Sequence, residues 1–177
     1  MRAPLPISPD QVERYDYEYK RNGTRNLFVF FEPGQGWRHL AITATRTMPD
    51  FARQMKWLVD ERYPEAESIR VVLDNLNTHR AAALYETFEP GEARRILKRL
   101  EFHYTPKHGS WLNMAELELS VFDRQCLDRR IGDEPTLAHE INALETERNV
   151  AHATVNWRFN LDDARTKLKR LYPSKLS

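Results

Sequence analysis

The stretch "VVLDNLNTH", residues 71–79, decides how this chain folds. Val71, Val72 and Leu73 are three consecutive apolar residues, which predicts a strand that is buried on both faces. The apolar run ends at Asp74, and a polar cluster follows it. In α/β folds ligands bind beyond the carboxyl ends of strands, so Asp74 stands where such folds place functional groups. A plain turn or helix-capping role also explains this aspartate, because Asp favours such positions.

The residues before this strand predict an antiparallel meander. "VERYDYEY" (12–19), "NLFVFFEP" (26–33) and "WRHLAITATR" (37–46) alternate or are rich in strand-favouring residues, and turn sequences separate them. The pattern then changes to a helical period over residues 48–63, where Pro49 suits the helix start. The buried strand itself is expected at 68–74.

The residues after the strand predict mostly helices, with one further short strand at 101–106. Helices are expected at about 79–88, 90–100, 112–130, 135–149 and 161–171. Antiparallel strands followed by strand, helix, strand and helix predict a mixed α/β sheet flanked by helices.

Composition is that of an ordinary globular protein with one domain. The 177 residues are 41% hydrophobic and 30% charged, and no apolar run approaches membrane-spanning length. Residues 1–11 contain three prolines, so we expect a linker or extended arm there and the domain at 12–177. The single cysteine, Cys126, cannot form an internal disulfide, which favours a cytoplasmic location and a place in the core.

Positive charge is unevenly distributed, although the net charge is only +1. The segments "ARRILKRL" (93–100) and "ARTKLKRLYPSK" (164–175) are strongly basic. Such clusters suit contacts with DNA phosphates. Charge alone favours the simpler interpretation that they are solvated helix faces.

A second stretch with candidate chemistry is "HYTPKHGSWLNMAELELSVF", residues 103–122. Glu116 follows Asn113 by three residues, as in a capping box, so Glu116 can simply satisfy a helix start. On the predicted helix an apolar stripe separates Glu116 from Glu118, with one glutamate on each side. The residues alone therefore leave the choice between these two glutamates open.

Paired carboxylates from separate elements suit Mg²⁺ or Mn²⁺, because these hard cations prefer oxygen ligands. Two such ions about 4 Å apart can activate a nucleophile and stabilise the leaving oxygen of a phosphoryl transfer. A third carboxylate is normally needed to hold both ions.

Both stretches together resemble the bacterial insertion-sequence branch of the mariner-like DDE transposases, which have a ribonuclease-H-like fold. The resemblance runs from about residue 4 to 173 and is most specific at "SWLNMAELE". It implies that Asp74 is the second catalytic aspartate and that Glu116, not Glu118, is the final acidic residue. It also implies Mg²⁺-dependent cleavage and joining of double-stranded DNA by paired subunits, in the bacterial cytoplasm.

Several residues beside the two carboxylates are weaker candidates. Asn75 and His79 suit positions that orient a metal-bound Asp74, although His79 can equally belong to a helix start without chemistry. Lys107 and His108 suit DNA phosphate contacts, or form a plain polar loop. The remaining neighbours are Asn113, beside Glu116 in the motif, and Trp111, for which packing is the expected role.

The resemblance breaks at the beginning of the sequence. In the family, the first catalytic aspartate ends a first strand, and a linker resembling "RAPLPISPDQVERYDYEY" follows. Met1 falls inside this linker, so we expect the first strand, its aspartate and the upstream helix-turn-helix region to be absent. Asp10 and Asp16 lie after the catalytic position in the family register and do not replace it.

The absent first strand has a physical consequence, because it is central in ribonuclease-H-like sheets. It lies between the second strand and the strand that ends at Asp74, so both would lose a partner. Each orphaned buried backbone group costs about 1–3 kcal/mol, against a total stability of about 5–15 kcal/mol. We therefore expect a chain that is unstable alone or has its gap filled, and that does not cleave DNA. The alternatives are a non-enzymatic protein that binds DNA or transposase, and an inert remnant.

Overall fold

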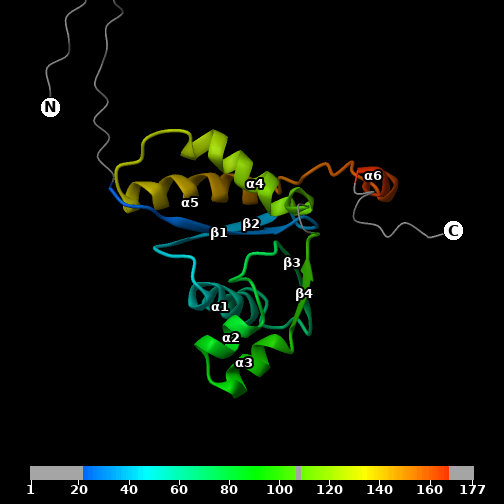
Figure 1. Cartoon of the computed structure of the whole chain (residues 1–177). Helices are drawn as coiled ribbons and strands as arrows, with labels where there is room; N and C mark the ends of the chain where they lie inside the picture. Colours follow the sequence, from blue (N-terminus) through cyan, green and yellow to red (C-terminus); the bar gives the residue numbers. More distant parts are fainter. Residues whose placement is uncertain (1–21, 107–108, 168–177) are drawn as a thin grey trace, which may run out of the picture.

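The computed structural model describes residues 22–106 and 109–167 of the chain. These residues form two small sheets surrounded by helices (Figure 1). The antiparallel sheet pairs β1 (Asn26–Glu32) with β2 (Trp37–Thr43), and the parallel sheet pairs β3 (Ile69–Leu73) with β4 (Leu100–Tyr104). The mixed α/β class expected from the sequence is confirmed.

The helices follow the expected order with shifted ends. They are α1 (Met48–Trp57), α2 (Ala82–Thr87), α3 (Pro90–Leu97), α4 (Met114–Phe122), α5 (Glu134–Val150) and α6 (Leu161–Lys167). The helices expected at 48–63 and 112–130 each end in a π-helical turn, at Leu58–Arg62 and Asp123–Leu127. The expected strand at 12–19 lies outside the described residues.

Helices lie on both sides of the β1–β2 hairpin. Figure 1 shows α4 and α5 above the hairpin, α1 to α3 below it, and the β3–β4 sheet standing at one side. No helix of the described ranges has the length and apolar composition needed to cross a membrane.

The strand β1 is covered on both faces because its side chains alternate between two apolar clusters. Phe28 and Phe30 pack against the larger cluster, which α1, α2, α3 and β3 build. Leu27 and Val29 pack against a smaller cluster that includes Phe122 of α4. This explains why the sequence of β1 is almost continuously apolar.

Local signals in the sequence set the start of α1. The Thr47 side chain accepts a hydrogen bond from the Asp50 amide, and the Asp50 carboxylate accepts one from the Thr47 amide. This capping box satisfies backbone donors that the helix itself leaves unpaired. One turn into α1, Phe51 is 3% exposed and faces the larger cluster.

The turn between β1 and β2 needs a glycine. Gly36 has a φ of 63°, and a Cβ at this position would lie 2.5 Å from the carbonyl oxygen of His152. His152 follows the end of α5, so the close approach holds the hairpin turn against that helix terminus. Any side chain here would both strain the backbone and collide.

The antiparallel and parallel halves remain separate sheets. Within the described residues β1 pairs only with β2, and β3 pairs only with β4. The mixed sheet is therefore split between its two halves.

Candidate metal and DNA site

Asp74 directly follows β3, and its carboxylate is partly exposed. Its Oδ1 accepts a hydrogen bond from the Leu76 amide at 3.3 Å and lies 2.6 Å from Nδ1 of His79. The side chain is 41% exposed. The bond to Leu76 fits the turn interpretation, but within the described residues neither bond uses Oδ2. One carboxylate oxygen thus stays available for a ligand.

Aromatic packing holds the His79 ring beside Asp74. The ring stacks on Phe51 with centroids 4.9 Å apart, and Phe28 lies 6.2 Å away on centroids. The carbonyl oxygen of His79 accepts a hydrogen bond from the Tyr104 hydroxyl at 2.9 Å. His79 lies in the loop ahead of α2, and its Nδ1 contact restricts the orientation of the Asp74 carboxylate.

Asn75 has a different role from His79. Its side-chain amide donates to the carbonyl oxygen of Thr105, and the Thr105 amide donates to Leu73 at 2.9 Å. These bonds tie the loop after β3 to the residue that follows β4. Asn75 therefore fixes the loop that carries Asp74, without a contact to the carboxylate in the described structure.

The two glutamates of α4 have opposite environments. Glu118 is 0% exposed and accepts hydrogen bonds from Nε of Arg38 at 3.0 Å and from Nη2 of Arg148 at 2.9 Å. Glu116 lies two residues earlier, in the first turn of α4, and is exposed. Glu118 is thus a buried structural carboxylate, whereas Glu116 faces solvent.

The start of α4 is capped without the Glu116 side chain. Asn113 is the N-cap residue, and its side chain accepts a hydrogen bond from the Ala115 amide at 3.1 Å. In the described part of the chain the reciprocal bond of a capping box is absent. Asn113 is therefore a capping residue, and the cap does not engage the Glu116 carboxylate.

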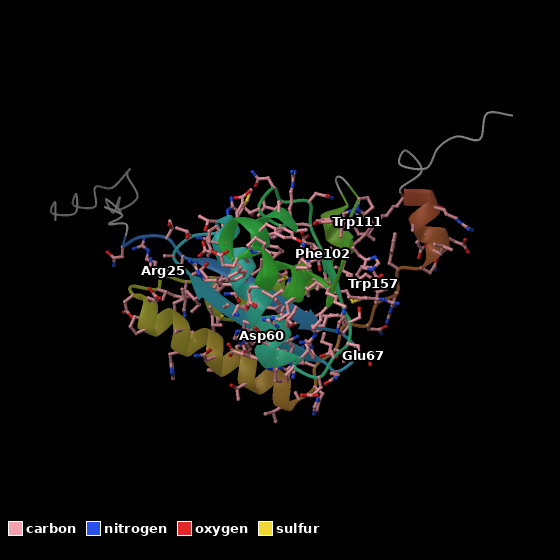
Figure 2. All side chains as sticks on the ribbon, turned by 90° about the horizontal axis from the view of Figure 1, so that it is seen from below. Arg25, Asp60, Glu67, Phe102, Trp111 and Trp157 are labelled. Carbon is pink, nitrogen blue, oxygen red and sulfur yellow. The ribbon has the colours of Figure 1, made fainter. Side chains whose placement is uncertain are left out.

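The aromatic ring ahead of α4 is a packing group, as expected. Trp111 contacts Phe159 edge-on with centroids 4.9 Å apart, and Nζ of Lys167 lies 5.1 Å from the Trp111 centroid. Figure 2 shows Trp111 and Trp157 on the same side of the molecule. The other candidates of this loop, Lys107 and His108, lie outside the described residues.

Ion pairs engage part of the basic segment at 93–100. Arg95 pairs with Asp60 at 2.7 Å and with Glu92 at 2.9 Å. Arg99 donates to backbone carbonyl oxygens, among them that of Val59 at 3.1 Å. These contacts agree with a structural role for the engaged arginines. Most of the segment at 164–175 falls outside the described residues.

A hollow in the described part of the chain is bordered by neither Asp74 nor Glu116. It has a volume of about 590 Å³ and is bordered by residues 22–25 and the loop before α5. Its Arg25 pairs with Glu134 at 2.6 Å. Neither Asp74 nor Glu116 lines this hollow, so it is no part of the candidate site.

Asp74 and Glu116 fit a hard divalent cation by their donor chemistry, because both offer exposed carboxylate oxygens. Residues 105–113 connect β4 to α4, and Figure 1 shows α4 beginning above the ends of β3 and β4. Nowhere in residues 22–106 and 109–167 do three or more His, Cys, Asp or Glu side chains form a group that could hold a metal ion.

The expectation of a strand buried on both faces is wrong for β3, because Val72 is 55% exposed and only Leu73 is buried. An exposed carboxylate at the carboxyl end of a strand in a mixed α/β fold still suits a hard cation. A family model for DDE superfamily endonucleases matches residues 2–138, and the chain belongs to this family. Endonucleases of this family act on DNA and generally use divalent metal ions. No curated protein and no solved structure matches the chain.

Proposed function

We propose that this chain is part of the catalytic domain of a transposase from the bacterial insertion-sequence branch of the mariner-like DDE enzymes. Asp74 and Glu116 bind Mg²⁺ or Mn²⁺, and the intact enzyme cleaves double-stranded DNA at transposon ends and joins the strands as paired subunits. The observation that carries the proposal is the contrast within the acidic residues. Arginines neutralise Glu118, whereas Glu116 and one oxygen of Asp74 remain accessible.

The residues of this chain prepare the site for a phosphodiester. A bound divalent ion supplies activation of the attacking hydroxyl or water and stabilisation of the leaving oxygen. Asp74 offers an oxygen ligand at the rigid tip of β3, and the 2.6 Å contact to His79 fixes its orientation. Glu116 offers a second oxygen ligand from α4. The remaining ligands are water, phosphate oxygens or a carboxylate outside the described residues.

The alternative is a protein that binds DNA or an intact transposase without cleaving DNA. It is favoured by the missing third acidic group within the described residues. Under this alternative the 177-residue chain binds the metal ion without cleaving DNA.

The test combines a Mn²⁺ titration by calorimetry with nicking of supercoiled plasmid. We expect Asp74→Asn and Glu116→Gln each to weaken Mn²⁺ binding about tenfold or more, since each removes one ligand. Glu67→Gln, an exposed carboxylate in the loop before β3, is the control and should bind Mn²⁺ as the wild type does.

Two outcomes would change this conclusion. Wild-type Mn²⁺ affinity in both Asp74→Asn and Glu116→Gln would remove these residues from the site. Metal-dependent nicking that Asp74→Asn abolishes would show that the chain is catalytically complete, and would exclude the non-cleaving alternative.

A further inference from the structure

A hollow of about 390 Å³ lies beside Asp74, between the loop after β3 and the end of β4. Its lining combines apolar side chains with a guanidinium, an amide and a phenol ring. The residues are Asn75, Leu76, Arg80, Ala81, Ala82 and Tyr104. This volume lies within the range of pockets that hold small ligands. Because Asn75 follows Asp74 directly, the hollow begins one residue from the candidate metal ligand.

Arg80 brings a positive charge to this hollow that nothing in the described structure neutralises. Its side chain is exposed, and within residues 22–106 and 109–167 it makes no ion pair and no hydrogen bond. Arg38 and Arg95, in contrast, pair with carboxylates. A guanidinium presents a planar fork of donors that matches a phosphate group. Arg80 is therefore suited to an anionic ligand from outside the chain.

Tyr104 supplies an accessible aromatic ring to the same hollow. It is 43% exposed. Its hydroxyl donates to the His79 carbonyl oxygen at 2.9 Å, so the side chain is held in place while it remains accessible. Aromatic rings of this kind stack on nucleic-acid bases with little dependence on base identity.

We propose that this hollow holds one nucleotide of a DNA strand next to the reacting phosphate, with Arg80 on its phosphate and Tyr104 against its base. The inference rests on the proposed function, because Asp74 defines where the reacting phosphate lies. Phosphates of one DNA strand are spaced about 3.4 Å apart along the helix axis. A strand that meets Asp74 therefore has neighbouring phosphates within a few residues' reach of Arg80, which lies in the same loop six residues after Asp74.

The experiment measures fluorescence anisotropy of a labelled 20-nucleotide DNA, single-stranded and as a duplex, across a NaCl series in EDTA. Arg80→Ala should weaken binding about tenfold. It should also reduce the slope of log K against log NaCl concentration by about one, whereas Arg80→Lys should keep that slope. Tyr104→Leu should weaken binding to the single strand about tenfold without a change in slope. Tyr104→Phe keeps the ring and should bind as the wild type does.

Arg70→Ala is the charge-matched control. The Arg70 side chain is 79% exposed on β3, pairs with Glu101 at 3.2 Å and does not line the hollow. We expect its DNA affinity to stay within twofold of the wild type. Equal weakening by Arg70→Ala and Arg80→Ala, unchanged binding by Arg80→Ala, or no binding of either probe by the wild type would each overturn the proposal.

Two further measurements keep the test decisive if a variant does not fold. Ultraviolet cross-linking of wild-type protein to a 4-thiothymidine probe should label Tyr104 or residues 75–82, and labelling confined to other segments would refute the proposal. Mn²⁺ titration separates this inference from the proposed function. Arg80→Ala should keep Mn²⁺ affinity, and Asp74→Asn should lose it while still binding DNA in EDTA.

Discussion

Replacing Glu118 with alanine should remove a large part of the stability of this protein, because two arginines depend on this carboxylate. Arg38 and Glu118 are both 0% exposed, and Arg148 is 19% exposed. Burial lowers the pKa of Arg38, and the Glu118 carboxylate opposes that effect by favouring the charged guanidinium. Without Glu118 a fully buried positive charge would lose its partner.

The expected magnitude follows from measurements on buried ion pairs. Removing one partner of such a pair costs about 3–5 kcal/mol, whereas the whole domain is stable by about 5–15 kcal/mol. With a urea dependence of about 2 kcal/mol per molar, the unfolding midpoint should fall by about 1.5–2.5 M. Glu116→Ala changes an exposed side chain and should alter stability by no more than about 0.5 kcal/mol.

The assay is urea unfolding at pH 7, followed by far-ultraviolet circular dichroism. Glu118→Gln should fall between the wild type and Glu118→Ala, because the amide keeps the volume and one acceptor oxygen. If Glu118→Ala and Glu116→Ala unfold at the same urea concentration, the buried ion pairs contribute no net stability, and the structural assignment of Glu118 is refuted.

Three more predictions concern other parts of the molecule. His79→Phe keeps an aromatic ring but deletes the Nδ1 contact to Asp74. Mn²⁺ affinity measured by calorimetry should therefore fall about 10–100-fold, with little change in melting temperature. Unchanged Mn²⁺ affinity would contradict the proposal that His79 orients Asp74. The Arg95 guanidinium, more than any other group, holds the pKa of Glu92 at about 2. The ionised Glu92 carboxylate therefore stabilises the folded protein above the unfolded pKa of about 4.3, and this contribution is lost as the pH falls toward 2. Glu92→Gln should flatten the dependence of the urea midpoint on pH in this range. The Cys126 thiol is 5% exposed and burial raises its pKa, so it should react with a thiol reagent only when the protein unfolds; rapid reaction in the folded state would contradict its place in the core.

Much of the fold could be predicted because local patterns carry it. The alternation and apolar content of 26–33 and 37–46 predicted the hairpin, and the apolar run before Asp74 predicted β3. The helical stripe from residue 48 correctly indicated α1, which begins at the expected Pro49 turn. Helix ends were less predictable. The π-helical turn at Asp123–Leu127 changes the backbone within an uninterrupted apolar period.

The candidate site was predictable only in part. Asp74 was identified from its position at the end of an apolar run, and its contact with His79 lies within the same motif. Arg80 was missed, although it follows His79 directly, because one arginine in a polar loop has no distinctive pattern. Its significance depends on Tyr104, which β4 brings to the same hollow from a distant part of the sequence.

By itself, the sequence determined the secondary structure, the strand that delivers Asp74 and the short set of carboxylates with candidate chemistry. The resemblance implied Glu116 as the candidate ligand, but only the tertiary structure shows what Glu118 does instead. Glu116 and Glu118 are two residues apart and flank the same apolar stripe, so helical periodicity cannot distinguish them. The packing of β2 and α5 against α4 buries one side of this stripe and brings Arg38 and Arg148 to Glu118. The structural role of Glu118 depends on contacts between residues far apart in the chain, which helical periodicity does not encode.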